Sequence, residues 1–344
     1  MTDTLRFPAE WEPQSAVLLA WPHAGTDWAE RLGEVEETFI ALIAAIVRFE
    51  PVVLCVADDD IEAYARARLS SARVDMGLVR FVAVPYDDTW LRDTGPITLV
   101  GPGGATLLDF RFTGWGGKFE AGEDDQLVER LSRMGLFSNS VSQPIDFALE
   151  GGAIETDGQG TLLSTWRCLG ERHRDSDPAT VGRQLAGWLR QDRVLWLHHG
   201  YLEGDDTDAH VDTLARFAAP DAIVFQACDD PADSHYPELR AMADEIAALR
   251  TAGGQPYRLF PLPWPRPIVD GDRRLAASYA NFLIVNGAVL MPAYGDPADA
   301  LAAAVLAKAF PGREIVQVPC RALIWQNGSL HCLTMQVPKG IIHA

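Results

Sequence analysis

The sequence predicts an α/β fold in which five strand–strand–helix–strand (ββαβ) units form a closed ring. Two observations carry this prediction. The ββαβ pattern recurs four times along the chain, and a fifth copy at the N-terminus lacks its first strand. An apolar run at residues 332–337 is left over near the other terminus and can supply that strand, which would also cover an exposed sheet edge. We therefore expect residues 1–344 to form one domain.

Each unit is predicted from a turn between two apolar runs, followed by apolar residues at helical spacing. Dipeptides such as Asn286-Gly287 are strong hairpin signals, and apolar residues three to four positions apart predict a helix. The N-terminal unit is expected to have strands at 16–21 and 52–57 around a helix at 35–49. The other units are expected at strands 97–100 and 106–110 with helix 124–134; strands 153–156, 161–165 and 194–197 with helix 179–190; strands 211–217, 222–227 and 257–262 with helix 237–250; and strands 279–285, 288–292 and 314–318 with helix 298–310.

Composition narrows the class of partner. The chain has 48 acidic and 29 basic residues, a formal net charge of −19, which argues against nucleic acid or an anionic membrane and suits a cationic ligand. The N-terminus lacks the basic and apolar segments of a signal peptide, and no apolar run reaches the length of a membrane span. Five cysteines without a CxxC pair predict a reduced, cytoplasmic protein.

Residues able to do chemistry lie where the first strand of each unit begins. Asp93, Glu150, His210 and Cys332 mark four of the five starts, and the segment 278–281 marks the other. In a ring, equivalent strand starts lie close to the axis, so groups scattered along the chain would meet in one pocket. A thiol, a histidine and several carboxylates are the parts needed to attack a positively charged, electron-poor carbon, which points to a thiol enzyme acting on a guanidinium group.

Each candidate also has a structural interpretation. Cys332 could be a small core residue, as Cys55 within an apolar strand is expected to be, but a polar, glycine-bearing loop precedes it. His210 and Asp212 are two positions apart, so in a strand both would face one pocket. His210 could equally be a satisfied histidine at a strand edge, and a metal site lacks further ligands at suitable spacing. His331, next to Cys332, would face the opposite side of the strand.

The acidic and aromatic candidates are less specific taken singly. Asp93 and Glu150 each precede a turn and could be turn residues, although a carboxylate pair can hold the planar fork of a guanidinium. Trp90, Trp115 and Trp21 flank the same segments. Most tryptophans only pack, but one could stack on a guanidinium plane.

Taken together, these segments resemble the agmatine deiminases and related bacterial peptidylarginine deiminases of the pentein superfamily. The resemblance spans nearly the whole chain, from Pro8 to Pro338. Its ordered motifs are Trp-Leu-Arg-Asp-Thr-Gly-Pro at 90–96, Trp-Gly-Gly at 115–117, Leu-Glu-Gly-Gly at 149–152, Gly-Asp-Asp-Thr-Asp-Ala-His-Val-Asp at 204–212, Ser-Tyr-Ala-Asn-Phe at 278–282, Met-Pro-Ala-Tyr-Gly-Asp at 291–296 and Leu-His-Cys-Leu-Thr at 330–334. The fold it implies is the pentein α/β-propeller, with five ββαβ units around a pseudo-fivefold axis.

The resemblance also implies roles for particular residues. Cys332 is similar to the family nucleophile, His210 to its general acid and base, and Glu150 to the carboxylate beside that histidine. Asp93 and Asp212 are similar to the guanidinium clamp. The substrate-binding set it implies comprises Trp90, Asp93, Trp115, Asp206 and Asp212. Ala209 and the segment 326–329 depart from the common family pattern, and both lie beside the expected substrate.

The expected activity is hydrolysis of agmatine to N-carbamoylputrescine and ammonia, with no metal and no organic cofactor. The acidic loop 203–208 suits the ammonium tail of agmatine, whereas free or peptidyl arginine would need a cation for its carboxylate, such as Arg111, Arg167 or Arg216. Arginine or peptidyl-arginine deimination by the same mechanism is therefore kept as an alternative. A thiol amidase and a non-catalytic polyamine-binding protein are the more remote ones, and self-association into a homo-oligomer is left open.

Overall fold

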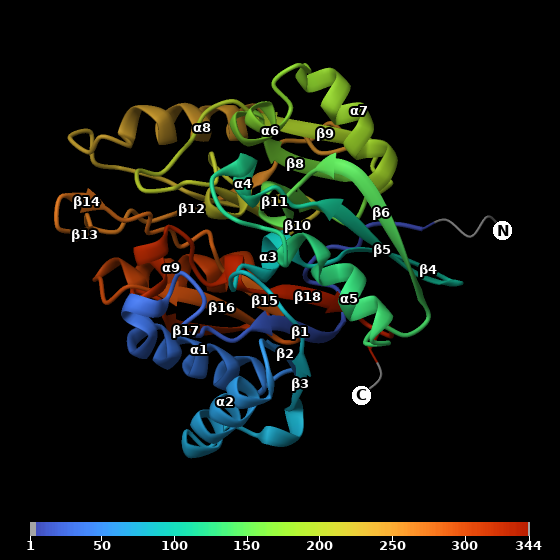
Figure 1. Ribbon diagram of the computed structural model, residues 1–344. Coiled ribbons are helices and arrows are strands. Elements are labelled where there is room, and N and C mark those ends of the chain that lie inside the picture. Colours follow the sequence, from blue (N-terminus) through green and yellow to red (C-terminus); the bar gives the residue numbers. More distant parts are fainter. Residues whose placement is uncertain (1–4, 343–344) are drawn as a thin grey trace.

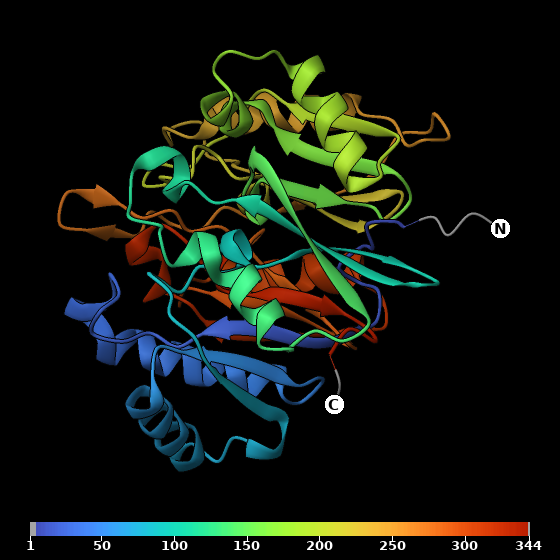
Figure 2. The same ribbon diagram turned by 45° about the vertical axis from the view of Figure 1, so that its right-hand side comes forward.

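The computed structural model describes residues 5–342 and shows an α/β protein with helices packed outside short sheets (Figures 1 and 2). In both views the helices of residues 32–46 and 59–71 lie at one end of the molecule, the helix of residues 178–189 lies at the other, and the C-terminal strand runs between them. The described strands form six separate sheets rather than one continuous closed sheet.

The two ends of the chain share a four-stranded sheet. Strand β18 (Met335–Pro338) pairs antiparallel with β1 (Gln14–Ala20), and β1 runs parallel to β2 (Val52–Val56), which runs parallel to β3 (Val79–Ala83). The predicted pairing of the C-terminal strand with the N-terminal unit is confirmed. β2 is apolar and buried throughout, as a central parallel strand must be. The helix α2 (Asp59–Ser71) and β3 extend this unit beyond its prediction.

Four further sheets repeat one pattern, in which an antiparallel pair is followed by a parallel third strand. The first three are β4 (Ile97–Gly101), β5 (Gly104–Arg111) and β6 (Ser140–Ala148); β7 (Ile154–Thr156), β8 (Thr161–Thr165) and β9 (Arg193–Leu197); and β10 (Ala215–Ala219), β11 (Ala222–Gln226) and β12 (Arg258–Leu262). The fourth is β15 (Leu283–Val285), β16 (Ala288–Ala293) and β17 (Glu314–Pro319), and a small hairpin, β13 (Val269–Asp270) with β14 (Arg273–Arg274), stands apart. The predicted recurrence is therefore present, with β6 as a strand that the prediction lacked.

The longer helices cross between the strands of their units. They are α1 (Leu32–Ile46), α5 (Leu127–Arg133), α6 (Trp166–Arg172), α7 (Pro178–Leu189), α8 (Tyr236–Ala248) and α9 (Ala298–Ala309). The start of α7 shows how the sequence sets a boundary. The Asp177 side chain accepts a hydrogen bond from the Thr180 N–H, and Pro178 occupies the first turn, where its missing N–H costs no hydrogen bond.

A short helical turn precedes the first strand of several units. The prediction was wrong here, because it began two of these strands too early. The turns are α3 (Leu91–Thr94) before β4, η4 (Gly151–Ala153) before β7, η5 (Val211–Thr213) before β10 and η7 (His331–Leu333) before β18. The strands predicted to begin at 211 and 332 therefore begin at Ala215 and Met335. The remaining short elements are η1 (Ala29–Arg31), η2 (Met76–Leu78), α4 (Gly114–Gly117), η3 (Asp124–Gln126) and η6 (Leu323–Gln326).

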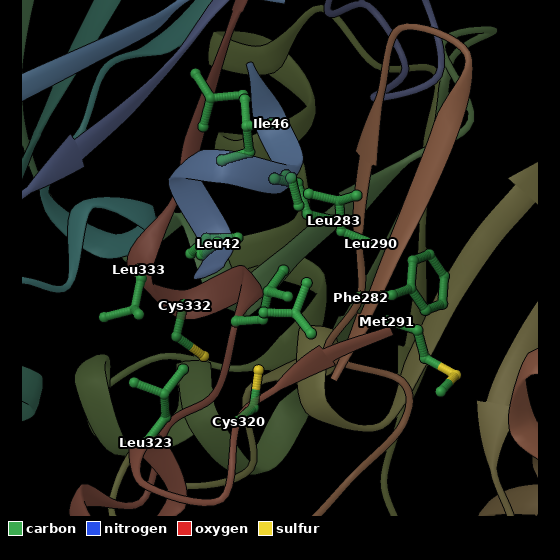
Figure 3. Packing of buried hydrophobic residues seen from close by; sticks show 14 of the residues in the cluster. Leu42, Ile46, Phe282, Leu283, Leu290, Met291, Cys320, Leu323, Cys332 and Leu333 are labelled. Carbon is green, nitrogen blue, oxygen red and sulfur yellow. The ribbon is translucent and has the colours of Figure 1, made fainter. Parts of the chain in front are cut away.

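The largest buried cluster joins the N-terminal and C-terminal units. Leu42 and Ile46 of α1 pack with Leu283 and Leu290 of the β15–β16 pair and with Leu333, beside Cys332 (Figure 3). The turn that carries Cys332 is thus anchored on one side by an apolar core. Among residues 5–342, every helix is too short or too polar to cross a membrane.

Candidate active site

The short turns bring the predicted chemical residues together. Asp93, Glu150, His210 and Cys332 lie three to five residues ahead of the first strands of their units, in or beside α3, η4, η5 and η7. Contacts link them with Asp212 of η5: Cys332 to Asp212, and His210 to both Asp93 and Glu150. All five predicted catalytic positions therefore share one site, although they come from four separate segments.

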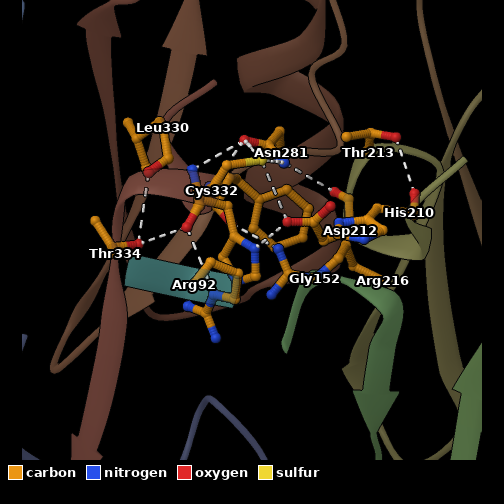
Figure 4. Close-up of polar contacts among 12 residues, drawn as sticks. Arg92, Gly152, His210, Asp212, Thr213, Arg216, Asn281, Leu330, Cys332 and Thr334 are labelled. Atoms are coloured by element: carbon orange, nitrogen blue, oxygen red, sulfur yellow. Dashed lines mark hydrogen bonds and ion pairs between the residues drawn. The ribbon is translucent and has the colours of Figure 1, made fainter. Parts of the chain in front are cut away.

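The Cys332 thiol is almost fully buried and faces polar groups. Its Sγ lies 3.5 Å from Asp212 Oδ2 and 3.2 Å from Asn281 Nδ2. Figure 4 shows this thiol and Asn281 together, with Asp212 and His210 beside them. Burial, reinforced by the negative charges of Asp212 and Asp93, raises the pKa of Cys332 well above its ordinary value. Without a bound cation, these surroundings therefore disfavour the thiolate.

Asp212 is bonded on one side and open on the other. Its Oδ2 accepts a hydrogen bond from His331 Nδ1 at 2.8 Å in addition to the thiol contact. Its Oδ1 is buried and has no hydrogen-bond partner within residues 5–342. Burial would raise the pKa of Asp212, but attraction to His331, His210 and Arg216 holds it below its ordinary value. Asp212 is thus a carboxylate with one oxygen available for a donor.

The prediction that His331 points away from the site was wrong. It assumed a strand, in which neighbouring side chains alternate, but His331 and Cys332 lie in a 3₁₀ turn. Both side chains therefore reach Asp212, and His331 Nε2 also lies 2.8 Å from Glu10 Oε2. The pairing of His210 with Asp212 likewise rests on the η5 turn rather than on strand alternation.

His210 is placed between two carboxylates. Its Nδ1 lies 3.7 Å from Asp93 Oδ1 and its Nε2 lies 3.6 Å from Glu150 Oε2, and neither nitrogen has a hydrogen-bond partner in the described part of the chain. Burial disfavours a charged imidazole, but Asp93, Cys168 and Glu150 outweigh it and raise the pKa of His210 well above its ordinary value. The imidazole is therefore held protonated and aimed at two acids.

The two acids are held differently. Asp93 Oδ2 accepts from Trp115 Nε1 and Oδ1 from the Gly152 N–H, each at 2.9 Å. Burial, then Asp212 and Glu150, raise the pKa of Asp93 to about 6, against the pull of His210. Burial would also raise the pKa of Glu150, but His210 and Arg172 hold it below its ordinary value.

Gly152 allows this close approach. A Cβ at position 152 would lie 2.6 Å from His210 Nδ1 and 2.8 Å from Asp93 Oδ1. Any larger residue would separate the imidazole from the carboxylate. The second glycine after Glu150 is thus required by packing at the site itself.

A cavity of about 380 Å³ opens onto Cys332. The predicted substrate-binding residues Trp90, Asp93, Trp115 and Asp206 line it, together with Asp27, Asp88, Phe119, Thr207, Arg273, Trp325, Gln326, Asn327 and Gly328. Asp212, the fifth predicted binding residue, does not line this cavity and contacts the Cys332 sulfur instead. Trp21, another tryptophan near these segments, is fully buried in the core.

The departures from the family pattern shape the wall of this cavity. A Cβ at Gly328 would lie 2.3 Å from the Trp90 ring, so the backbone of the 326–329 segment packs directly on that indole. Asn327 Nδ2 donates to Asp206 Oδ2 at 2.8 Å. Ala209 has a positive φ of 70° and its N–H donates to Asp205, so the loop before His210 is fixed by the acidic segment.

Four site residues lay outside the predicted set. Asn281 holds the thiol, Arg172 Nε donates to Glu150 Oε1 at 2.7 Å, and Asp88 accepts from Trp90 Nε1 at 3.1 Å. Cys168 Sγ lies 3.9 Å from Glu150 Oε2. Asn281 could have been found from sequence, because it lies in the segment 278–281 that was predicted to start a strand. Cys168 and Arg172 lie in α6, where no sequence motif marks them. Glu150, Cys168 and His210 form the group in the described chain with donor atoms close enough to share a metal ion.

Comparisons with known proteins define the class. The chain matches the model of the Porphyromonas-type peptidyl-arginine deiminases over residues 6–338. An agmatine deiminase from Pseudomonas aeruginosa (strain LESB58) is 35% identical, over 98% of this chain and 96% of its own. The chain therefore belongs to the Porphyromonas-type peptidyl-arginine deiminase family.

Solved structures agree with this membership. A C. jejuni agmatine deiminase variant with substrate bound superposes with a TM-score of 0.90 at 32% identity, over 98% of this chain and 97% of that one. A candidate arginine deiminase from Porphyromonas gingivalis has the same TM-score at 44% identity, over 99% and 100%. The predicted α/β fold and family are confirmed.

Proposed function

We propose that the protein hydrolyses agmatine to N-carbamoylputrescine and ammonia through an S-amidino-cysteine intermediate. The observation that carries this proposal is the pair formed by the buried Cys332 thiol and Asp212: Oδ2 of this carboxylate contacts the sulfur, and its Oδ1 is buried without a hydrogen-bond partner among residues 5–342. A guanidinium carries donors that suit such an oxygen, and its carbon is the electrophile that a thiol can attack.

Asp93 and Asp212 would clamp the guanidinium. Asp93 is fixed by Trp115 and Gly152, and Asp212 by His331, so neither carboxylate needs to reorganise when the substrate enters. Fixing the planar cation in one orientation places its carbon against the sulfur, and such positioning can supply a large part of a rate enhancement. Trp90 and Trp115 line the cavity on the way to this clamp.

The substrate itself would activate the nucleophile. Burial, and after it the carboxylates of Asp212 and Asp93, raise the pKa of the Cys332 thiol, so a bound cation is needed to favour the thiolate. The thiol proton passes to solvent, the thiolate bonds to the guanidinium carbon, and His210 gives a proton to the nitrogen that leaves as ammonia. Neutral His210 next takes a proton from water, and the hydroxide attacks the amidino carbon. The C–S bond then breaks, and the departing sulfur takes the proton of the new hydroxyl, which yields the ureido product. Glu150 orients the imidazole throughout.

The acids of the cavity favour a substrate with a second positive charge. Asp27 and Asp206 line the cavity and suit the ammonium tail of agmatine, whereas burial raises the pKa of Asp88 to about 8 and weakens its contribution. One observation favours the alternative, arginine or peptidyl-arginine deimination: Arg273 also lines this cavity and could meet a carboxylate. Its guanidinium, however, is bonded to Asn327 Oδ1 at 2.9 Å and to the Trp325 carbonyl.

Ammonia release from agmatine, arginine and Gly-Arg, measured side by side, tests the proposal. We expect the highest kcat/KM with agmatine. A higher value with arginine or Gly-Arg would move the assignment to the alternative and leave the thiol chemistry intact, whereas no release from any guanidine would refute it. Asp206→Asn should raise KM for agmatine and leave KM for butylguanidine, which lacks the ammonium, unchanged.

We also infer that the whole chain is one domain with its units arranged around a pseudo-fivefold axis. Three successive contacts support a ring, because α1 packs against β17, α9 against β12 and α8 against β9. Each helix thus covers the last strand of a neighbouring unit. A cytoplasmic location, a role in putrescine biosynthesis and the absence of nucleic-acid and membrane partners remain predictions.

A further inference from the structure

A second thiol lies in the site, and the proposed reaction does not use it. Cys168 of α6 is fully buried, and its Sγ is 3.9 Å from Glu150 Oε2. The same carboxylate oxygen is 3.6 Å from His210 Nε2. The donor atoms of Glu150, Cys168 and His210 all lie within 4.8 Å of one another. A sulfur, a nitrogen and an oxygen donor therefore face a common point on the side of His210 away from Asp93.

We propose that Glu150 Oε2, Cys168 Sγ and His210 Nε2 form a site that binds Zn²⁺ and thereby inhibits the enzyme. Zinc binds S, N and O donors at about 2.3, 2.0 and 2.1 Å in tetrahedral geometry, which places the donors roughly 3.3 to 3.7 Å apart. The separations of Glu150 Oε2 from His210 Nε2 and from Cys168 Sγ, 3.6 and 3.9 Å, already approach these values. Small side-chain shifts suffice to complete the coordination, with water as a fourth ligand.

The donor atoms are free to bind an ion. His210 Nε2 is buried and has no hydrogen-bond partner among residues 5–342. Glu150 uses its other oxygen, Oε1, to accept from Arg172, so Oε2 remains for a metal. A thiolate, an imidazole and a carboxylate together form a donor set that suits zinc better than magnesium or calcium.

The nearby positive charge of Arg172 does not exclude a cation. Arg172 Nη1 lies 2.6 Å from Asp208 Oδ2, and its Nε bonds to Glu150, so two carboxylates offset this guanidinium. Asp93 lies 3.7 Å from His210 Nδ1 on the far side of the ring. In zinc sites a second carboxylate commonly holds the distal N–H of a ligating histidine in this way.

Zinc at this position would stop turnover without touching Cys332. Binding releases the Cys168 proton and any proton on His210 Nε2 to solvent, and both atoms donate a lone pair to the metal. The bound imidazole keeps its Nδ1 proton facing Asp93 and cannot accept another, so no imidazolium can form to protonate leaving ammonia. Because the three donors are buried, we expect the inhibition to develop slowly after mixing.

Cobalt binding to the Cys332→Ala protein tests the site independently of catalysis. Co²⁺ replaces zinc and gives a near-ultraviolet sulfur-to-cobalt charge-transfer band when a thiolate ligates it. We expect the band in the wild-type, Cys332→Ala and Cys228→Ala proteins and its loss in both Cys168→Ala and Cys168→Ser. In competition with Zn²⁺, either Cys168 variant should bind zinc at least about tenfold more weakly than the wild-type protein does.

Two outcomes would overturn the proposal. A band that survives in folded Cys168→Ser but disappears in Cys332→Ala would place the metal on the nucleophile. No band in any protein would mean that the site does not bind such ions. In the activity assay, Zn²⁺ added before agmatine should inhibit wild type reversibly, with full recovery on chelation, and inhibition that chelation cannot reverse would also contradict the proposal.

Discussion

Two clusters of buried charge meet at His331, and they differ in how fully their polar atoms are bonded. In the supporting cluster (Glu10, Arg92, Glu155, Arg216 and His331), Glu10 Oε2 accepts from Arg216 Nη2 at 2.7 Å and faces His331 Nε2 at 2.8 Å, and its Oε1 accepts from the Ile284 N–H. Arg216 further bonds Glu155 and the Phe282 carbonyl.

The supporting cluster has one buried side-chain atom without a hydrogen-bond partner among residues 5–342, Arg92 Nη2, whereas the reactive cluster (Asp93, Glu150, His210, Asp212 and Cys332) has three. Both nitrogens of His210 and Oδ1 of Asp212 are buried without a partner in the part of the chain that the structure describes. Leaving such groups unbonded costs stability, and proteins concentrate this cost where chemistry requires it. We therefore expect changes in the supporting cluster to alter folding and changes in the reactive cluster to alter turnover.

The largest expected effect follows loss of the proposed nucleophile. Cys332→Ser should lower kcat by about 10⁴-fold or more, because a hydroxyl in this acidic pocket is a far weaker nucleophile than a thiolate. Cys228→Ser should retain activity, since that thiol lies outside the cavity lined by Cys332. Ammonia release measures both. Appreciable turnover by a folded Cys332→Ser protein would refute nucleophilic attack by Cys332.

Breaking the supporting cluster should act on stability. Glu10→Gln leaves Arg216 with one less buried countercharge, and breaking a buried pair from one side lowers the free energy of unfolding by about 3–5 kcal/mol. Glu12→Gln is the matched control because its partner Arg6 is half exposed, and exposed pairs contribute about 1 kcal/mol or less. Urea unfolding compares the two. Equal losses would contradict a stabilising role of the buried Glu10–Arg216 pair.

A methyl group at Gly152 should disturb the reactive cluster alone. Gly152→Ala places Cβ against His210 and Asp93, and a displacement of about 1 Å in a catalytic group can lower turnover about 100-fold. Gly187→Ala, in helix α7 with open space around its Cβ position, should be tolerated. Steady-state kinetics and thermal unfolding separate the outcomes. Full activity in Gly152→Ala would refute the need for close approach at this point.

The smallest expected effect is a pH dependence from Asp93. Its pKa, raised to about 6 by burial and by Asp212 and Glu150, means that the clamp loses charge below that pH while His210 stays protonated. We expect kcat/KM to fall as pH drops from 7 to 5, approaching about tenfold per unit.

The raised pKa of Asp93 affects the free energy of unfolding in the opposite direction to its effect on kcat/KM. Because the folded state binds the Asp93 proton more tightly than the unfolded state, this residue reduces the stability of the substrate-free protein as pH rises from 3.8 to about 6. Asp93→Asn should remove that part of the pH dependence in urea unfolding. A kcat/KM that is flat between pH 5 and 7 would contradict the raised pKa.

The prediction from sequence succeeded where one pattern was repeated. Hairpin dipeptides and apolar helices marked most units, and the missing first strand located β18 beside β1. β6 escaped because Ser140–Ala148 is largely exposed and contains Pro144, so it carries little of the apolar alternation that marks a strand. β3 and α2 escaped because a complete strand–helix–strand unit had already been assigned before them.

At the site, sequence spacing could identify residues but not all their neighbours. His331 was misplaced because a two-residue alternation was applied to what is a 3₁₀ turn. Cys168 and Arg172 could not be found at all, since they lie 18 and 22 positions after Glu150 in a helix that carries no motif, and only folding brings them to it. Many metal sites can be recognised from the spacing of their cysteines along the chain. Glu150, Cys168 and His210 come from three separate segments, so no such spacing marks them.

The pairing of β18 with β1 has a consequence for synthesis on the ribosome. Translation at roughly 5 to 20 residues per second leaves about 15 to 60 s between the emergence of β1 and that of β18. During that interval β1 can pair with β2 on one edge but exposes its other edge, a template for unwanted association. The nascent chain also carries the acids and His210 before it carries Cys332. The thiol is thus added last, together with the strand that covers the open edge.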